Sequence, residues 1–254
     1  MAIFTKHSIY KVVTPFVKGI LSHSTTRNLV DNVITKHSIQ YLEIGGAVPV
    51  EDYLVVHLSP VEIYGIPRKR NIGIHYNYDF ANHAFQKETK QLSNAFTLNY
   101  NLMNGIPVSD NSMKGINMSH FLEHFTRMDG LKILRECKRI LAPGGALRIS
   151  CPDLRKYAAA YLSKDDDYFN HPLVSRFVNY EGLTSYGDLF IHKAYDGHNG
   201  HKWFYDAESA IKLCLEAGFK SGVEKKVHET SLPHVNTIEP LYREKESFYI
   251  EAYN

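Results

Sequence analysis

Short apolar runs alternate with amphipathic stretches along most of the chain. Apolar runs that end at glycine, or that are rich in β-branched and aromatic residues, predict strands; these runs cover 41–47, 53–58, 95–100, 116–119, 146–151, 219–228 and 247–253. Apolar residues at helical spacing predict helices over 25–35, 79–92, 128–141 and 206–217. Strands that alternate with helices predict an α/β fold, with a parallel sheet covered by helices on both faces.

The clearest helix prediction covers residues 128–141. Its apolar face carries Leu131, Leu134, Cys137 and Leu141. The sequence Pro143-Gly144-Gly145 follows and ends the helix, and the strand 146–151 comes next. In a sheet of this kind, ligands bind beyond the carboxyl ends of the strands. We therefore expect functional side chains where the predicted strands end.

The length of 254 residues suits one large α/β domain. We expect that domain to cover 39–254, behind an N-terminal helical extension over 1–38. Two segments, 62–94 and 155–204, interrupt the strand and helix pattern and are predicted to be insertions or a lid. The second of them is rich in tyrosine and phenylalanine, which form either a ligand-binding wall or a core.

Composition narrows the class of protein. The formal net charge is +2, with 44% hydrophobic and 22% charged residues, so no strongly basic surface for nucleic acid is expected. The chain has three cysteines, Cys137, Cys151 and Cys214, and no CxxC spacing. This argues against a disulfide framework and against a cysteine-zinc site, and we therefore expect a cytoplasmic setting. No apolar run is long enough to span a bilayer. The sequence leaves the oligomeric state open.

Several motifs then resemble one enzyme family. They are His120-Phe121-Leu122-Glu123-His124, the turn Arg139–Gly145, the segment Gly200–Asp206, and Glu216–Phe219. Together they resemble class I S-adenosylmethionine-dependent methyltransferases of type 11, and most closely a bacterial subgroup associated with cell-surface glycan genes. The resemblance covers residues 40–254. It implies a Rossmann-like, doubly wound sheet that is mostly parallel with an antiparallel C-terminal strand.

The resemblance also implies a cofactor, S-adenosylmethionine, and positions that contact it. These are Glu43, Gly45, Gly46, His57, Asn101, Leu102, Ser119 and His120. The chain departs from the family pattern at four places. Ala47 replaces the last glycine of the turn, and His57, Asn101 and Lys114 stand where the family has acids, although the amide oxygen of Asn101 can still accept from adenine. Ala47, His57 and Lys114 keep open an alternative, a catalytically silent binding or scaffold protein on the same fold.

The methyl acceptor implied by the resemblance is a hydroxyl of a small molecule or glycan. Such a hydroxyl needs a base near neutral pH, and the candidates are Asp153, His198 and His201. Asp153 is equally well placed to cap the following helix. The residues expected to bind the acceptor are Trp203, Tyr157 and His124.

Two histidine patterns raise the question of a metal. The spacing His120-x-x-Glu123-His124 also occurs in inverted zinc peptidases, and Asp196, His198 and His201 gather in a glycine-bearing loop with His192 upstream. The first pattern lies in a strand-to-helix turn instead of a long metal-binding helix. The second is explained as well by a loop that packs Trp203. The sequence therefore predicts no metal, and a histidine-metal hydrolase is a third and weaker hypothesis.

Overall fold

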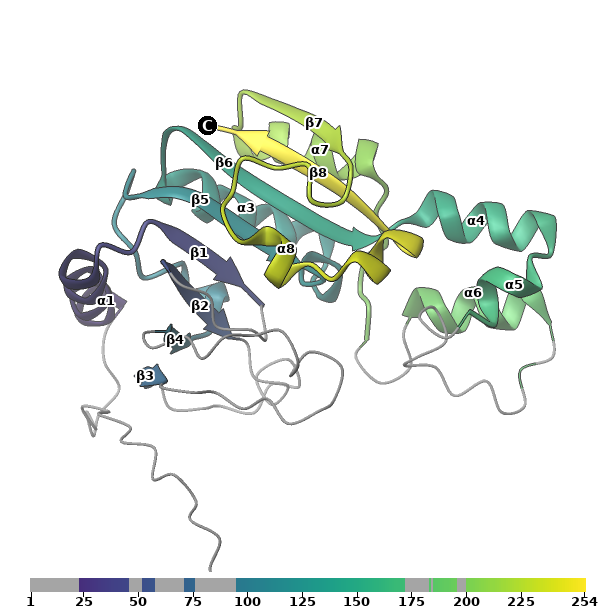
Figure 1. Ribbon diagram of the computed structural model, residues 1–254, viewed down its shortest axis with the longest axis horizontal. Coiled ribbons are helices and arrows are strands. Elements are labelled where there is room, and N and C mark those ends of the chain that lie inside the picture. The colour runs from purple at the N-terminus through teal and green to yellow at the C-terminus, as the bar shows by residue number, and fades with distance from the viewer. Residues whose placement is uncertain are drawn as a thin grey trace, which may run out of the picture.

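The chain forms one mixed sheet of eight strands in the part that the computed structural model describes, residues 23–45, 52–57, 71–75, 95–171, 183, 185–195 and 200–254 (Figure 1). The strands are β1 (Tyr41–Ile44), β2 (Tyr53–His57), β3 (Asn71–His75), β4 (Ala95–Asn99), β5 (Met113–Ser119), β6 (Leu141–Pro152), β7 (Ser221–Lys225) and β8 (Ser247–Tyr253). Their order across the sheet is β3-β4-β2-β1-β5-β6-β8-β7.

Strand direction confirms the predicted fold class. Strands β4, β2, β1, β5 and β6 pair in parallel, and β8 runs antiparallel to both β6 and β7. The arrangement is Rossmann-like and mostly parallel, with an antiparallel C-terminal strand. The edge strand β3, antiparallel to β4, was not predicted, because Gly73 interrupts its short apolar pattern.

The helices are α1 (His23–His37), α3 (Arg127–Ile140), α4 (Leu154–Ser163), α5 (Asp166–Phe169), α6 (Tyr186–Tyr195), α7 (Ala207–Ala217) and the single turn α8 (Val235–Ile238), with 3₁₀ turns η1 (Leu102–Asn104), η2 (Leu122–His124) and η3 (Leu241–Lys245). None of these helices is long and apolar enough to cross a bilayer. The helix predicted over 79–92 lies outside the described residues.

Local signals set the ends of the two best-predicted helices. Thr126 caps α3 by accepting a hydrogen bond from the backbone N–H of Asp129. Asp206 and Ser209 form a reciprocal capping box at the start of α7, and Gly218, at φ +102°, ends it in the left-handed region. Both helices therefore begin and end within one or two residues of their predicted bounds.

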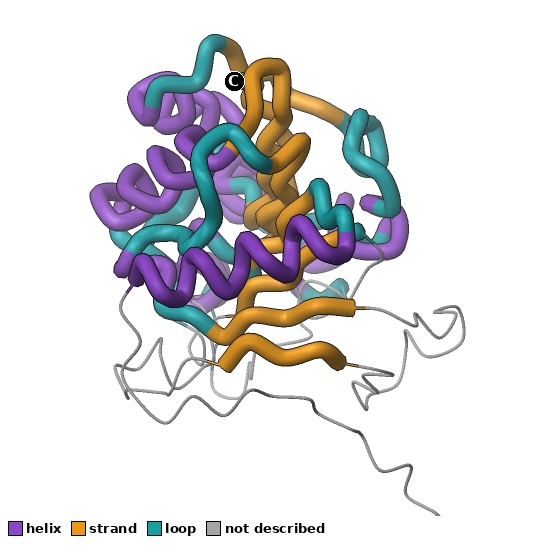
Figure 2. Tube along the Cα trace, turned by 90° about the vertical axis from the view of Figure 1, so that its left-hand side faces the viewer, coloured by secondary structure: helices purple, strands orange, loops and turns teal. Residues whose placement is uncertain are grey.

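Among the described residues, the two faces of the sheet are covered differently. Helices α3 and α7 pack together against one face, whereas residues 226–246, which carry α8 and η3, cover β5, β6 and β8 on the other (Figures 1 and 2). The connection from β1 to β2 contains only eight residues, 45–52. Helical crossovers between parallel strands usually need a dozen residues or more.

A helical lobe, made of α4, α5 and α6, lies beyond the carboxyl end of β6 (Figure 1). It corresponds to the described parts of the predicted insertion 155–204. Its own apolar core holds Tyr157, Ala160, Tyr168 and Phe169, with Tyr186 and Phe190 packed against them. These members of the aromatic run therefore fill a core. At the opposite end of the sheet, α1 packs through Val30 and Ile34 into the main core.

Candidate functional site

The carboxyl end of β5 leads into a polar cluster. Ser119 ends the strand, and its hydroxyl lies 3.0 Å from that of Ser150 in β6. His120 follows at φ +48°, a left-handed conformation that is uncommon for residues other than glycine. Its Nε2 lies 2.7 Å from Ser247 Oγ, and its Nδ1 lies 3.2 Å from Arg243 Nη1. In this structure His120 thus ties β5 to β8 and η3.

Glu123, His124 and His201 come together immediately after this turn, and we call them the Glu123 cluster. One potential ligand atom from each residue lies within 4.8 Å of the other two. Burial raises the pKa of the Glu123 carboxyl, but the imidazoles of His120, His124 and His201 outweigh that effect and hold the pKa well below its ordinary value. Glu123 is therefore an anion inside the protein.

A second buried carboxylate, Glu246, links the sheet to the helical lobe. Its oxygens accept hydrogen bonds from Arg243 at 2.8 Å and from the hydroxyl of Tyr157 at 3.1 Å, and Lys193 Nζ lies 3.5 Å away. Burial raises the pKa of Glu246, but the charges of His120, Arg243 and Lys193 lower it by more. The pKa of Glu246 therefore lies below its ordinary value. The charge of Glu246 holds α4, α6 and η3 together.

Asp153 follows β6 and caps α4. Its Oδ1 accepts a hydrogen bond of 3.0 Å from the backbone N–H of Arg155, so the capping role is present. Burial raises the pKa of this carboxyl above its ordinary value, against the opposing effect of Arg155. Asp153 also forms a β-bridge with Tyr205, which places it next to the segment that carries His201.

The predicted glycine turn begins as expected. Gly45 follows β1 at φ +78°, and a Cβ built at this position would lie 2.4 Å from the Phe121 ring. The close approach that requires glycine here is therefore made to Phe121. The next residue of the turn, Gly46, lies outside the described residues.

Other predicted cofactor contacts are placed as follows. Asn101 Oδ1 caps η1 by accepting a hydrogen bond of 2.9 Å from Met103 N, and Leu102 is buried in the main core. His57 is the last residue of β2, the position expected for a ribose contact. Glu43 accepts a hydrogen bond from the side chain of Asn117 in the neighbouring strand β5.

The predicted acceptor and base residues fall in different environments. Trp203 is 44% exposed, and Tyr157 has no exposed surface. His124 is half-buried, and His201 is buried beside it with 5.2 Å between ring centroids. His198 lies outside the described residues. The structure therefore brings His124, His201 and Trp203 together on one side of the rim.

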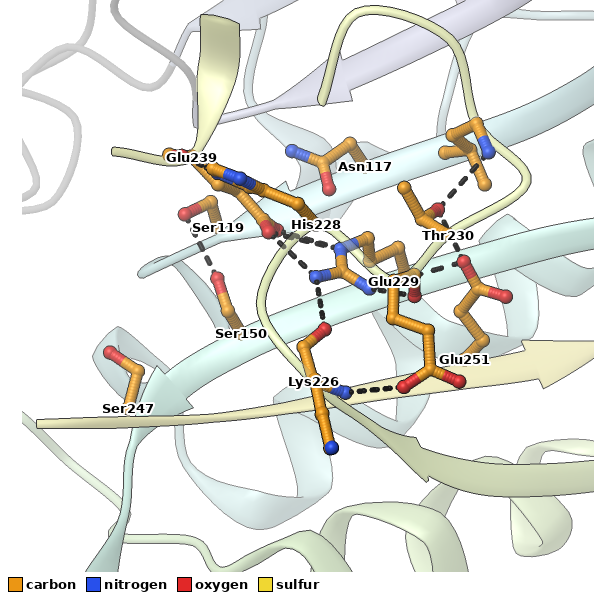
Figure 3. Close-up of polar contacts among 12 residues, drawn as sticks. Asn117, Ser119, Ser150, Lys226, His228, Glu229, Thr230, Glu239, Ser247 and Glu251 are labelled. Atoms are coloured by element: carbon orange, nitrogen blue, oxygen red, sulfur yellow. Dashed lines mark hydrogen bonds and ion pairs between the residues drawn. The ribbon is translucent and has the colours of Figure 1, made fainter. Parts of the chain in front are cut away.

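A row of buried polar residues crosses the sheet and was missed by the sequence analysis. Glu43 pairs in register with Asn117, Asn117 with Arg148, and Arg148 with Glu251, on β1, β5, β6 and β8. Asn117 donates a hydrogen bond of 2.7 Å to Glu43, and Arg148 binds Glu239 through Nε and Nη2 at 2.8–3.1 Å. Figure 3 shows Asn117 and Glu251 of this row, with Lys226, Glu229 and Glu239 on the segment beside them.

Burial shifts the pKa of Glu43. The pKa is raised well above the ordinary value by burial and, to a lesser extent, by the charge of Glu239, while the bond from Asn117 acts in the opposite direction. The Oε1 atom of Glu43 accepts no hydrogen bond from the described residues. The signal available in the sequence is one polar residue inside each of several otherwise apolar strands. The sequence analysis interprets only Glu43 among these residues, as a cofactor contact.

Comparison with known families supports the resemblance in part. Residues 62–149 match the profile of a family described as the methyltransferase domain. The matched segment includes β4, β5, α3 and most of β6, and it ends before Asp153 and before the 200–219 motifs. It begins after the glycine turn and β2. The match is to a methyltransferase domain over these residues alone, and the class I type and the glycan-associated subgroup belong to the proposal below.

Solved methyltransferase structures show only distant similarity. A SAM-dependent methyltransferase from Archaeoglobus fulgidus has 11% identity and a TM-score of 0.42 over 90% of this chain and 94% of that one. One from Thermotoga maritima has 17% identity and a TM-score of 0.40, over 92% and 99%. A candidate O-methyltransferase from Nostoc punctiforme has 14% identity and a TM-score of 0.40, over 91% of this chain and 56% of that one. No curated protein matches.

The described residues fit S-adenosylmethionine only in part. The strand ends and Gly45 stand where the methyltransferase fold binds it. However, the Cβ space at Gly45 is filled by Phe121, and the nitrogens of His120 and the amide oxygen of Asn101 already have protein partners. The eight-residue connection 45–52 is also short for the helix whose N-terminus usually faces an anionic ligand group.

Proposed function

We propose that this chain is an S-adenosylmethionine-dependent methyltransferase that methylates a hydroxyl of a small molecule or glycan. The match of residues 62–149 to the methyltransferase domain carries the proposal. The strand order, with its antiparallel β8, supplies the scaffold. The polar cluster at the carboxyl ends of β5 and β6 supplies the place, because ligands of such sheets bind at that edge.

Methyl transfer to a hydroxyl requires alignment of the acceptor and removal of its proton. Asp153 and His201 lie at the same rim as Ser119 and are proposed as bases, together with His198. The raised pKa of Asp153 brings it closer to neutral pH, where a general base is most effective. Trp203, with 44% of its surface exposed beside His201, is proposed as a wall for the acceptor.

The acceptor class rests on the resemblance to the glycan-associated subgroup. The small net charge of +2 fits an acceptor that is not a nucleic acid. A cytoplasmic location, where S-adenosylmethionine is available, belongs to the same proposal.

A second candidate function is a binding or scaffold protein with a degenerate cofactor site. The eight-residue connection 45–52 favours it, because that connection is short for a helical crossover. His57 at the end of β2 favours it as well, because an imidazole cannot accept from two ribose hydroxyls as a carboxylate does.

Calorimetry with S-adenosylhomocysteine separates the two functions. The enzyme is expected to bind one equivalent of S-adenosylhomocysteine saturably. If millimolar ligand gives no heat of binding, the enzyme proposal is rejected and the scaffold function remains. The variant His57→Asp is expected to tighten binding by restoring a carboxylate at the ribose position. An unchanged or weaker affinity in this variant would show that His57 does not face the ribose.

A further inference from the structure

The Glu123 cluster has the composition of a metal site. Glu123 and His201 are buried and His124 is half-buried, and their potential ligand atoms lie within 4.8 Å of one another. The two imidazole rings meet with a centroid distance of 5.2 Å and an angle of 57°. The sequence analysis predicted no metal because it considered the histidines of each motif separately, whereas the cluster takes one histidine from each.

Backbone hydrogen bonds hold the two segments of the cluster together. The carbonyl oxygen of Glu123 accepts from the N–H of Lys202 at 2.8 Å and from that of Trp203 at 3.2 Å. Glu123 and His124 belong to η2, which follows β5 directly. The segment with His201 is therefore attached to the main sheet. An ion that binds here does not have to order a free loop.

The Glu123 carboxylate provides a separate argument for a cation. Its Oε2 accepts a hydrogen bond of 3.3 Å from the thiol of Cys151. Its Oε1 is buried and accepts no hydrogen bond from the described residues, and His120 Nδ1, 3.4 Å away, is already paired with Arg243 Nη1. Burying an acceptor without a donor is costly, and a bound cation removes that cost. His120 and Cys151 then orient the carboxylate, as outer residues do in metal sites.

We infer that the Glu123 cluster binds one divalent transition-metal ion of the zinc type through Glu123, His124 and His201. Two imidazoles and one carboxylate are a zinc-binding set with an open fourth position. Because Zn–N bonds are about 2.0–2.1 Å long, tetrahedral ligand atoms lie about 3.3 Å apart. The ligands therefore approach one another by about 1.5 Å at most, within reach of side-chain rotation of the half-buried His124.

The open position suggests a role that rests on the proposed function. The cluster lies one turn beyond Ser119, on the rim where the acceptor is proposed to bind. An acceptor hydroxyl that coordinates zinc loses its proton more readily, because the ion stabilises the alkoxide. In this arrangement His201 is a ligand and no longer a base, and the proton passes to the carboxylate of Asp153. Zinc binding itself is measured without cofactor or acceptor, so its failure is distinguishable from failure of the methyltransferase proposal.

The test is a zinc titration of the full chain after treatment with a chelator. Trp203 is the only tryptophan, and its backbone N–H donates to the carbonyl oxygen of Glu123, so its fluorescence is expected to report on the cluster. Elemental analysis gives the zinc stoichiometry. The variants His124→Ala and His201→Ala each remove one ligand. His37→Ala is the matched control, because it removes one of the other histidines, at the end of α1.

We expect one equivalent of zinc, with an affinity at least tenfold lower in His124→Ala and in His201→Ala and unchanged in His37→Ala. No zinc binding, or equal effects of all three variants, would overturn the inference and indicate weak binding to scattered histidines. If His201→Ala fails to fold, the half-buried His124→Ala decides the question alone. Co²⁺ gives a second readout, since its visible absorption bands distinguish ligation by this cluster from a hydrated ion.

Discussion

Removal of the Arg148 guanidinium is expected to destabilise the protein strongly. Arg148 has no exposed surface and forms a salt bridge with Glu239, whose side chain is 1% exposed. It also donates to the carbonyl oxygens of Glu229 and Lys226, at 3.1 and 3.3 Å. The variant Arg148→Met keeps an apolar side chain of similar length. It leaves a carboxylate and two carbonyl groups under residues 226–246 without their donor.

The magnitude follows from these losses. A buried carboxylate that loses its hydrogen-bonding cation costs about 3 kcal/mol, because an unsatisfied charged group costs more than an unsatisfied neutral one. The two carbonyl groups add about 1 kcal/mol each. We expect the free energy of unfolding to fall by about 5 kcal/mol. This agrees with the 3–5 kcal/mol that is typical when one partner of a buried pair is removed.

Urea unfolding, followed by circular dichroism at pH 7, measures this loss. The double variant Arg148→Met/Glu239→Gln removes both charges and is expected to recover at least about 2 kcal/mol of it. The control Arg155→Met breaks an exposed pair with Glu224, whose side chains are 51% and 54% exposed, and is expected to change stability by less than about 1 kcal/mol. A cost for Arg148→Met no larger than that of the control would refute the reasoning.

Three further changes test other parts of the structure. Because burial raises the pKa of Glu43, the folded protein holds a proton that the unfolded chain releases, so the free energy of unfolding falls as pH rises above about 4.5. The variant Glu43→Gln should remove this slope, which is at most about 1.4 kcal/mol per pH unit. Equal urea midpoints at pH 5 and pH 7 in both proteins would contradict this expectation. Gly45→Ala should cost more than the 1–2 kcal/mol or so expected from its left-handed backbone, because the new Cβ meets Phe121. The control Gly200→Ala, at φ +60° and with no described atom within 4 Å of its new Cβ, should show the backbone cost alone in thermal unfolding. Asp153→Ala should lose about 1 kcal/mol of stability, because the helix cap of α4 is lost. Asp153→Asn keeps the cap and should lose only methyl transfer. Full activity of Asp153→Asn would show that Asp153 is not the base.

The sequence by itself determined the fold class and most of the central strands and helices. The apolar runs at 41–47 and 53–58 become β1 and β2, and the helices predicted at 128–141 and 206–217 become α3 and α7. Periodicity and capping are local properties of the chain, so each is readable without knowledge of distant residues. The role of Asp153 as a helix cap was readable for the same reason.

Tertiary structure alone decided which polar side chains meet. His124 and His201 are neighbours because β5 and the segment before α7 share one rim, and nothing in either motif records that approach. Glu43 joins Asn117 because β1 and β5 pair in that register, although many residues separate the strands in the chain. Contacts of this kind depend on strand order and on the length of each connection. Local patterns specify whether a side chain is buried, and the folded topology specifies its neighbours.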